Sequence, residues 1–190
     1  MPSETAICNT ALTRLGHDQI ASLDDESTAG RACKLLYRQT RDSLLREHPW
    51  NFAIRRATLA RESAAPEFEY AYRYPLPADC LRVIRLGEEV YSSADPDYRV
   101  EGGRVLTDEG SVHVEYIAQV ADAESFDPMF ADCLAQRLAA ELAIRLTDNS
   151  TLAEQAWRVY AQKLSLARTF DAREGTPRTI EADNWTVARL

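Results

Sequence analysis

The sequence predicts an α+β fold that is mainly helical, with a small β region inserted between two helical stretches. Apolar residues recur at helical spacing before residue 48 and again after residue 126. Between them, short runs alternate apolar and polar residues and are separated by glycine and proline, as in strands joined by turns. The last two helical stretches are joined by a short connection, which favours an antiparallel helical bundle.

Length and composition support one soluble domain. The chain has 190 residues, of which 45% are hydrophobic and 27% charged, enough for a real core. We divide it into a bundle core (1–48 and 126–174), an inserted β region (49–125) and a C-terminal segment (175–190). The net charge of −8 argues against a protein that coats duplex DNA, because phosphate binding needs a positive surface. The apolar runs are too short to span a membrane, and the N-terminus lacks a signal-peptide pattern. We therefore expect no membrane association and place the protein in the cytosol or in an assembly built there.

Two helices are expected before residue 48. The first covers residues 4–15, with Ser3 as its N-cap and Gly16 as its stop. The second runs to about Glu47, and the acidic residues 24–26 place negative charge at its N-terminus, which favours the helix dipole. Its core-facing positions are Ala29, Cys33, Leu36, Tyr37, Thr40 and Leu44, while Arg31, Lys34, Arg38 and Arg41 are expected largely elsewhere.

A corner is predicted at residues 48–52. Pro49 lacks the N–H that a helix would use and restricts the residue before it, so the chain must turn there. Trp50 and Phe52 supply apolar surface that can hold the corner in place. A strand is then expected within residues 50–59.

The middle of the chain predicts an antiparallel meander. Tyr70, Tyr72 and Tyr74 alternate with other residues and are expected to share one face of a strand, where sheet packing explains them better than a ligand platform. Further strands are expected over residues 81–86 and 112–116. Between them, Gly102 and Gly103 supply the positive φ angles of a tight hairpin turn.

Two long helices are expected to close the bundle. Asp127 as N-cap and Pro128 at the first helical position open one that runs to about Leu146. Thr151 and Glu154 form a capping box for the other, which runs to about Ala172. The inner face of this last helix is predicted to hold Ala153, Ala156, Trp157, Tyr160, Leu164 and Ala167. The polar stripe of the first of these helices, Arg137, Glu141 and Arg145, could form a solvated ladder of ion pairs or line an interface, and we favour the ladder.

The residues that usually carry chemistry form no recognisable site. The cysteines have neither zinc-ligand nor redox spacing and are expected to be reduced, buried thiols: Cys8, Cys33, Cys80 and Cys133. The histidines belong to no metal motif: His17, His48 and His113. The acidic run at residues 24–26 could in principle bind Mg²⁺, but a helix N-terminus explains it better. We therefore predict no catalytic, cofactor-binding or metal-binding residues, and a protein that works by being assembled rather than as an enzyme.

The C-terminal segment has neither helical nor strand periodicity, yet it carries four large apolar residues: Ile180, Trp185, Val187 and Leu190. A polar segment that buries nothing would be expected to lack them. The residues leave two interpretations open. The segment folds back on its own domain, or it docks on a neighbouring chain as an arm.

A more specific signal comes from strings of residues within positions 5–85. These strings are Ala6-Ile7-Cys8-Asn9, Leu15-Gly16, Ile20 with Ser22-Leu23-Asp24-Asp25, Tyr37 with Arg41-Asp42, His48-Pro49-Trp50-Asn51-Phe52-Ala53, and Tyr72-Arg73-Tyr74-Pro75-Leu76-Pro77-Ala78-Asp79-Cys80-Leu81-Arg82-Val83. Together they resemble the tail tubular, or head-to-tail adaptor, proteins of tailed bacteriophages. Beyond residue 85 the resemblance is one of layout only.

The resemblance implies a ring of twelve subunits beneath the portal protein, in the neck of the virion. Such a ring continues the DNA channel and receives the tail nozzle or another tail component. It also implies that the C-terminal segment is an extended arm that reaches the portal, with Ile180, Trp185, Val187 and Leu190 as its contact residues. A negative channel lets DNA pass without specific binding, because it repels phosphate.

The sequence leaves two alternative functions. One is a helical small-molecule-binding protein or enzyme with a pocket between the bundle and the tyrosine-lined strand, which would need converging titratable groups in a deep pocket. The other is a DNA-binding regulator, which the negative charge disfavours.

Overall fold

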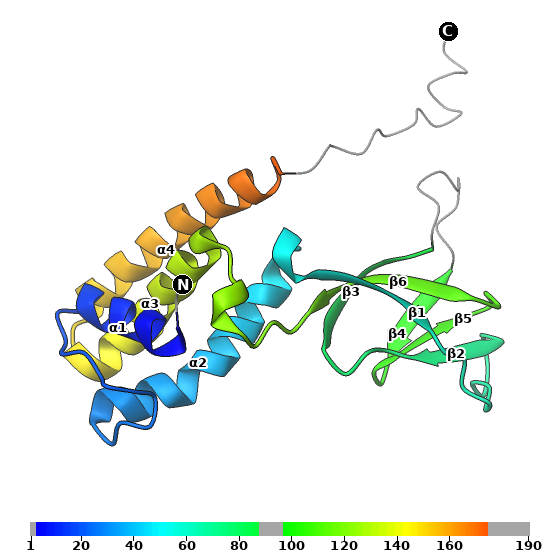
Figure 1. Cartoon of the computed structure of the whole chain (residues 1–190), viewed down its shortest axis with the longest axis horizontal. Coiled ribbons are helices and arrows are strands. Elements are labelled where there is room, and N and C mark those ends of the chain that lie inside the picture. Colours follow the sequence, from blue (N-terminus) through cyan, green and yellow to red (C-terminus); the bar gives the residue numbers. More distant parts are fainter. Residues whose placement is uncertain (1–2, 88–96, 175–190) are drawn as a thin grey trace, which may run out of the picture.

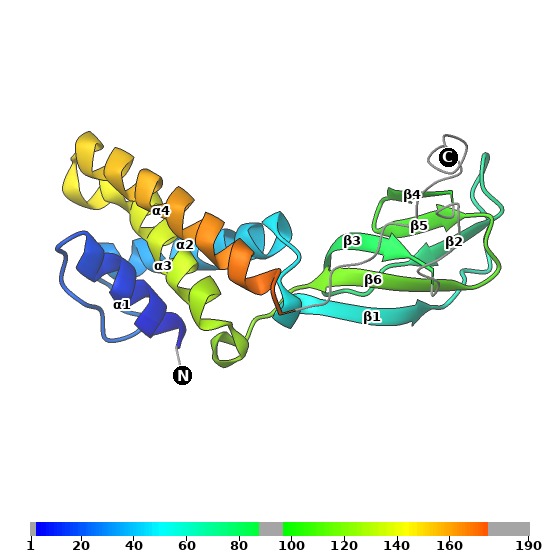
Figure 2. The same cartoon turned by 90° about the horizontal axis from the view of Figure 1, so that it is seen from above.

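The computed structural model describes residues 3–87 and 97–174. Four helices gather at one end of an elongated molecule and six strands at the other (Figures 1 and 2). The helices are α1 (Glu4–Arg14), α2 (Thr28–Glu47), α3 (Pro128–Thr147) and α4 (Ser150–Asp171). The strands are β1 (Ile54–Leu59), β2 (Tyr72–Pro75), β3 (Cys80–Leu86), β4 (Tyr98–Glu101), β5 (Arg104–Thr107) and β6 (Val112–Ala118). The fold is therefore α+β, as the sequence predicts.

Two of the four helix starts agree with the predicted caps. Ser3 accepts a hydrogen bond from the backbone N–H of Ala6, and Asp127 caps α3 with Pro128 in the first turn. The other two differ. The cap of α2 is Ser27, while Asp25 accepts the Ser27 N–H at 2.8 Å, so the acidic run shapes the preceding turn rather than the first helical turn. The N-cap of α4 is Asn149, whose side-chain Oδ1 accepts the backbone N–H of Leu152 at 3.0 Å. It takes the place of Thr151, the cap in the predicted capping box.

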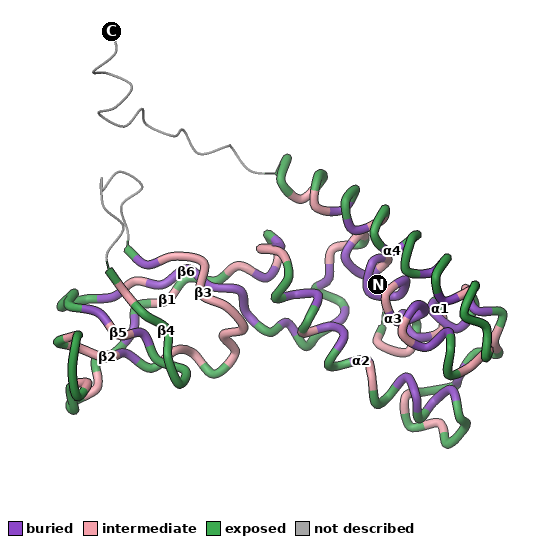
Figure 3. The backbone as a smooth tube through the Cα atoms, turned by 180° about the vertical axis from the view of Figure 1, so that it is seen from behind, coloured by how far each residue is buried: buried purple, intermediate pink, exposed green. Residues whose placement is uncertain are grey.

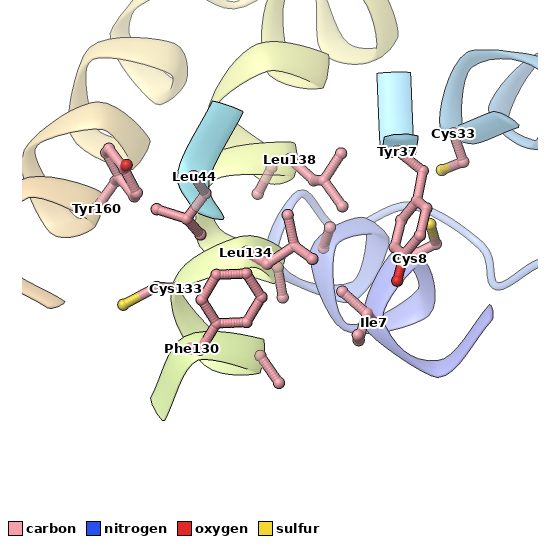
Figure 4. Close-up of a cluster of buried hydrophobic side chains, with 14 of the residues drawn as sticks. Ile7, Cys8, Cys33, Tyr37, Leu44, Phe130, Cys133, Leu134, Leu138 and Tyr160 are labelled. Atoms are coloured by element: carbon pink, nitrogen blue, oxygen red, sulfur yellow. The ribbon is translucent and has the colours of Figure 1, made fainter. Parts of the chain in front are cut away.

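The core of the helical end is built around α3, which contacts each of the other three helices. Phe130, Leu134, Leu138 and Leu142 of α3 are completely buried there. Figure 4 shows Leu134 and Leu138 between Ile7, Cys8 and Tyr37 on one side and Tyr160 of α4 on the other. Asp132 ties α3 to α1 and α4 through ion pairs with Arg14 and Lys163.

The predicted thiols lie where apolar neighbours shield them. All four are free, with Cys8, Cys33 and Cys133 buried and Cys80 half-buried. The fold brings Cys8 of α1 and Cys33 of α2 together beside Tyr37, although the two are far apart in the sequence (Figure 4). The sequence spacing gave no hint of this pairing, because it depends on how the two helices cross.

Two expectations about the helix faces were wrong. Trp157 was placed on the inner face of α4, but it is 43% exposed because it lies at the flank of the buried stripe. Arg41 was placed away from the core, but it is only 4% exposed. Its guanidinium is paired with Asp42 at 2.8 Å, which lets the charge be buried.

The strands form two antiparallel three-stranded sheets, in the orders β1–β6–β3 and β2–β5–β4. The predicted meander is therefore wrong, although the antiparallel pairing is right. Among the strands that the structure describes, only β4 and β5 are neighbours both in sequence and in a sheet, and a two-residue turn joins them. Gly102 and Gly103 have φ angles of 54° and 74° in that turn, as predicted. The connection between β1 and β2, residues 60–71, is long enough to carry the chain from one sheet to the other.

The predicted tyrosine stripe is only partly present. β2 begins at Tyr72, so Tyr70 lies before the strand. Tyr74 is buried, and its hydroxyl donates to the carbonyl oxygen of Glu109 at 2.7 Å, so it packs the sheet as expected. Residues from both sheets share a second buried cluster, in which β6 is the most completely buried strand (Figure 3).

Candidate assembly surface

The junction between the helices and the strands is held by Asp171, at the end of α4. Its Oδ2 lies 3.0 Å from Nε2 of His48, and its Oδ1 accepts the backbone N–H of Asn51 at 3.0 Å. The side-chain Nδ2 of Asn51 also donates to the backbone carbonyl oxygen of Asp171 at 2.6 Å. Because a carboxylate can only accept, the His48 Nε2 must carry the proton of this bond. The corner at residues 48–52 is thus tied to the point from which the C-terminal segment departs.

Aromatic packing holds the same corner from the core side. The Trp50 indole is 1% exposed, and its Nε1–H donates to the carbonyl oxygen of Leu44 at 3.0 Å, near the end of α2. The centroids of the Trp50 and Phe130 rings lie 5.2 Å apart, edge to face. The Phe52 ring meets the Phe130 ring in the same way, at 5.0 Å. Edge-to-face contacts of this kind add to the free energy gained by burial. The prediction that Trp50 and Phe52 hold the corner is confirmed.

The environment of His48 favours its neutral form. Burial lowers the pKa of His48 below its ordinary value, and Arg168 and Arg82 act in the same direction. The bond to Asp171 opposes this shift but does not cancel it. At neutral pH the junction therefore contains an uncharged imidazole that donates to a carboxylate.

Glu47, the last residue of α2, joins three helices. Its carboxylate binds Arg137 of α3 at 3.2 Å and Arg168 of α4 at 2.9 Å, and it accepts the Tyr160 hydroxyl at 3.2 Å. Burial raises the pKa of Tyr160 to about 12, so the hydroxyl stays protonated and remains a donor. Nothing in the sequence singled out Glu47, because its partners lie 90 or more positions away.

Two residues of the polar stripe of α3, Arg137 and Glu141, face another helix, while the third, Arg145, is exposed. Arg137 and Glu141 do form an ion pair, at 3.1 Å. However, Glu141 also accepts the hydroxyl of Thr40 on α2 at 2.7 Å, and the Arg137 side chain is only 17% exposed. The ladder is real between these two residues, but it lines the α2–α3 contact, so the solvated interpretation was wrong there.

A groove of about 980 Å³ runs along the outer flank of α4, and we call it the α4 groove. Its lining includes Glu47, Trp157, Tyr160, Leu164, Arg168 and Arg173. The Trp157 and Tyr160 rings meet edge to face at 5.8 Å, so the groove has an aromatic end and a basic end. The basic end is the C-terminal end of α4.

Other large apolar side chains of α4 are also exposed. Val159, Leu166 and Phe170 are spaced by seven and four residues, so they follow one line along the helix on the flank opposite the groove. They are 39%, 57% and 51% exposed. An apolar line on an outer helix surface is typical of a surface that meets another protein.

The β region presents a polar hollow instead. About 580 Å³ in volume, it is lined among others by Arg56, Arg85, His113 and Glu115. Burial opposes the ionisation of Glu115, but Arg85 at 2.7 Å and Arg56 at 3.3 Å outweigh it and hold the pKa of this carboxyl below its usual value. The carboxylate is therefore charged and paired with two guanidinium groups. These ion pairs join β6 to its two neighbours, β1 and β3.

The predicted contact residues of the C-terminal segment, Ile180, Trp185, Val187 and Leu190, lie outside the described residues. Within residues 3–87 and 97–174, no group of three or more His, Cys, Asp and Glu side chains is arranged to hold a metal ion. In the same ranges, no helix is long and apolar enough to cross a membrane. No protein-family model matches the chain, and no curated protein sequence matches it.

Proposed function

We propose that this protein is a structural head-to-tail adaptor of a tailed bacteriophage. It forms a ring under the portal protein, extends the DNA channel and attaches the tail. The observation that carries the proposal is the anchoring of α4 at Asp171, which fixes the base of the C-terminal segment against the corner at residues 48–52. A segment with a fixed base can be aimed at a partner, as an arm requires.

The residues behind the resemblance have structural roles that suit such a protein. His48, Trp50 and Asn51 tie the corner to α2 and α4 through the bonds described above. In the other string, Asp79 pairs with Arg55 at 2.7 Å and accepts the Tyr116 hydroxyl at 3.1 Å, which fixes the start of β3 against β1 and β6. These roles need no ligand, metal or reacting group.

Each part of the chain is assigned a partner. The four helices form an antiparallel bundle that is the body of a twelve-membered ring of copies of the chain. The arm, through Ile180, Trp185, Val187 and Leu190, binds the portal protein. The β region, with the polar hollow beside Glu115, is offered to the tail nozzle or another tail component. The protein is placed in the neck of the virion, after assembly in the cytoplasm of the bacterial host.

The charge of the chain supports a role as a conduit. A net charge of −8 repeated around a ring gives a negative field, and DNA phosphate is repelled by it. DNA would therefore slide through the channel without specific binding. No cofactor and no enzymatic step are part of the proposal.

A pocket between the helices and the strands would favour a ligand-binding protein or an enzyme instead. The α4 groove is lined by residues of α2, α4 and the turn that follows α4, and the hollow beside Glu115 by residues of the β region. Neither favours that second function, so we do not propose it.

The arm can be tested by removing residues 176–190. The shortened chain should keep its circular dichroism spectrum and still unfold cooperatively, because the described core ends before the deletion. It should fail to bind the portal protein of the same phage in a pull-down. A variant whose residues 176–190 are replaced by a glycine-serine sequence of equal length is the control, and it should fail as well. Portal binding by either variant would count against the arm.

A further inference from the structure

The α4 groove lies directly beside the start of the C-terminal segment. Arg173 lines its basic end, and the segment begins two residues later. We propose that in the free protein the α4 groove holds the chain's own C-terminal segment, which turns back at residues 175–177 and runs along α4. The proposal rests on the proposed function, since it assigns a resting place to the same residues that bind the portal.

The α4 groove leaves an aromatic and a basic side chain exposed, as expected of a surface to which a peptide binds. Trp157 is 43% exposed at its aromatic end, although tryptophan is costly to leave in water. At the basic end, the Arg168 side chain is 37% exposed, and its guanidinium pairs with the carboxylate of Glu47 alone among the described residues. Both ends would gain from a peptide with an aromatic residue and a carboxylate.

The length of the segment matches the groove. From Arg173 back to Trp157, sixteen helical positions span about 24 Å. From Arg178 to Trp185, seven positions of extended chain span about 23 Å. A segment that reverses at Gly175-Thr176-Pro177 therefore brings Trp185 level with Trp157. Glycine and proline are suited to that reversal.

The chemistry of the segment matches the groove in the same register. In an extended chain, alternate residues face the same way, so Glu181, Asp183, Trp185 and Val187 share one side. With Trp185 beside Trp157, Glu181 comes within reach of Arg168. Acidic residues thus meet the basic end, and apolar residues meet the aromatic end.

The chain's own segment is favoured over that of a second copy because it is already attached to the groove. A short connection gives an effective concentration on the order of millimolar, which a separate chain does not reach at ordinary protein concentrations. Portal binding must then withdraw the segment from the groove. Before assembly, the segment's apolar residues and Trp157 would cover one another, which keeps the free protein from associating.

Disulfide trapping in the full-length chain tests the inference. All variants carry Cys80→Ser, which removes the half-buried native thiol. The test variant adds Ala161→Cys, in the groove, and Asp183→Cys. The matched control pairs the same Asp183→Cys with Val159→Cys, which is exposed on the flank of α4 opposite the groove. A disulfide needs the two Cα atoms within about 7 Å, so only a seated segment favours the test pair.

We expect an intrachain disulfide to form at least about tenfold faster in the test variant than in the control, a difference that Trp185→Ala abolishes. Equal rates in the two variants would overturn the inference. A disulfide-linked dimer as the main product would also overturn it, because the groove would then hold the segment of a second copy. These outcomes do not decide portal binding. Equal rates, together with loss of portal binding on removal of residues 176–190, would refute the resting place and leave the adaptor standing.

Discussion

His48 and Asp171 lie 123 positions apart, yet Nε2 of the one and Oδ2 of the other are joined at 3.0 Å. The bond connects the end of α2 to the end of α4, and so fixes the junction between the helices and the strands relative to the base of the C-terminal segment. Asn51 binds the same aspartate through its backbone N–H. These bonds give a physical role to His48 and Asn51, two residues of a string that the sequence analysis noted only for its resemblance to the adaptor proteins.

Replacing Asp171 by alanine should loosen the junction. The change leaves the Asn51 N–H and the His48 ring without their acceptor, and an unsatisfied group costs about 1–3 kcal/mol. We expect the free energy of unfolding, measured by urea denaturation, to fall by that amount. Asp18→Ala removes an exposed carboxylate with no such contacts, and should change it by less than about 0.5 kcal/mol. Equal effects from the two substitutions would show that the bond contributes nothing.

The stability of the protein should decrease as the pH falls below about 6.5, the ordinary pKa of histidine. The pKa of His48 is lower in the folded protein, where burial, Arg168 and Arg82 all disfavour the charged ring. The unfolded chain therefore binds more protons in this range, and acid favours unfolding. Urea midpoints at pH 7.5 and pH 5 should differ less for His48→Gln than for the unchanged chain. The same difference in both proteins would refute the role of His48.

The buried aromatic contacts at the corner should contribute far more to the free energy of unfolding than exposed aromatic side chains do. Phe130→Ala removes a fully buried ring that touches Trp50, Phe52 and Phe126, and should cost about 3–5 kcal/mol of unfolding free energy. Phe68 is 74% exposed, so Phe68→Ala makes the same chemical change without opening a cavity, and should cost less than about 0.5 kcal/mol. Chemical denaturation measures both, and a small effect of Phe130→Ala would contradict the core described here.

Alkylation of the native protein should modify Cys80 first. Cys8, Cys33 and Cys133 are buried, and burial raises the pKa of Cys133 to about 11. Cys80 is half-buried, and its pKa is also raised by burial, so it should react more slowly than a free thiol. Mass spectrometry after treatment with N-ethylmaleimide should find one labelled site, and all four after unfolding in urea. Labelling of Cys33 as fast as Cys80 would contradict the packing of α1 on α2.

Local signals in the sequence were enough for much of the fold. Proline and glycine marked the corner at Pro49 and the hairpin at Gly102-Gly103, and the helix ends lie within a few residues of their predicted positions. These features depend on residues close together in the chain. The same signals gave a wrong strand order, because sheet pairing depends on how distant segments meet.

The candidate surface was harder to predict for the same reason. Asp171 and Glu47 act through partners 90 or more positions away, and no spacing rule reveals such pairs. Trp157 was assigned to the core because it lies at the edge of an apolar stripe, where the helical period does not show whether a neighbouring element covers the side chain. The line of Val159, Leu166 and Phe170 does have a sequence signal, its spacing of seven and four, which could have identified a second apolar side of α4.

The most direct test of the adaptor is electron microscopy of negatively stained mixtures of this protein with the portal protein of the same phage. We expect a second ring beneath each portal ring, coaxial with its channel, and no such ring when residues 176–190 are absent. Portal rings that look the same with and without the full-length protein would contradict it.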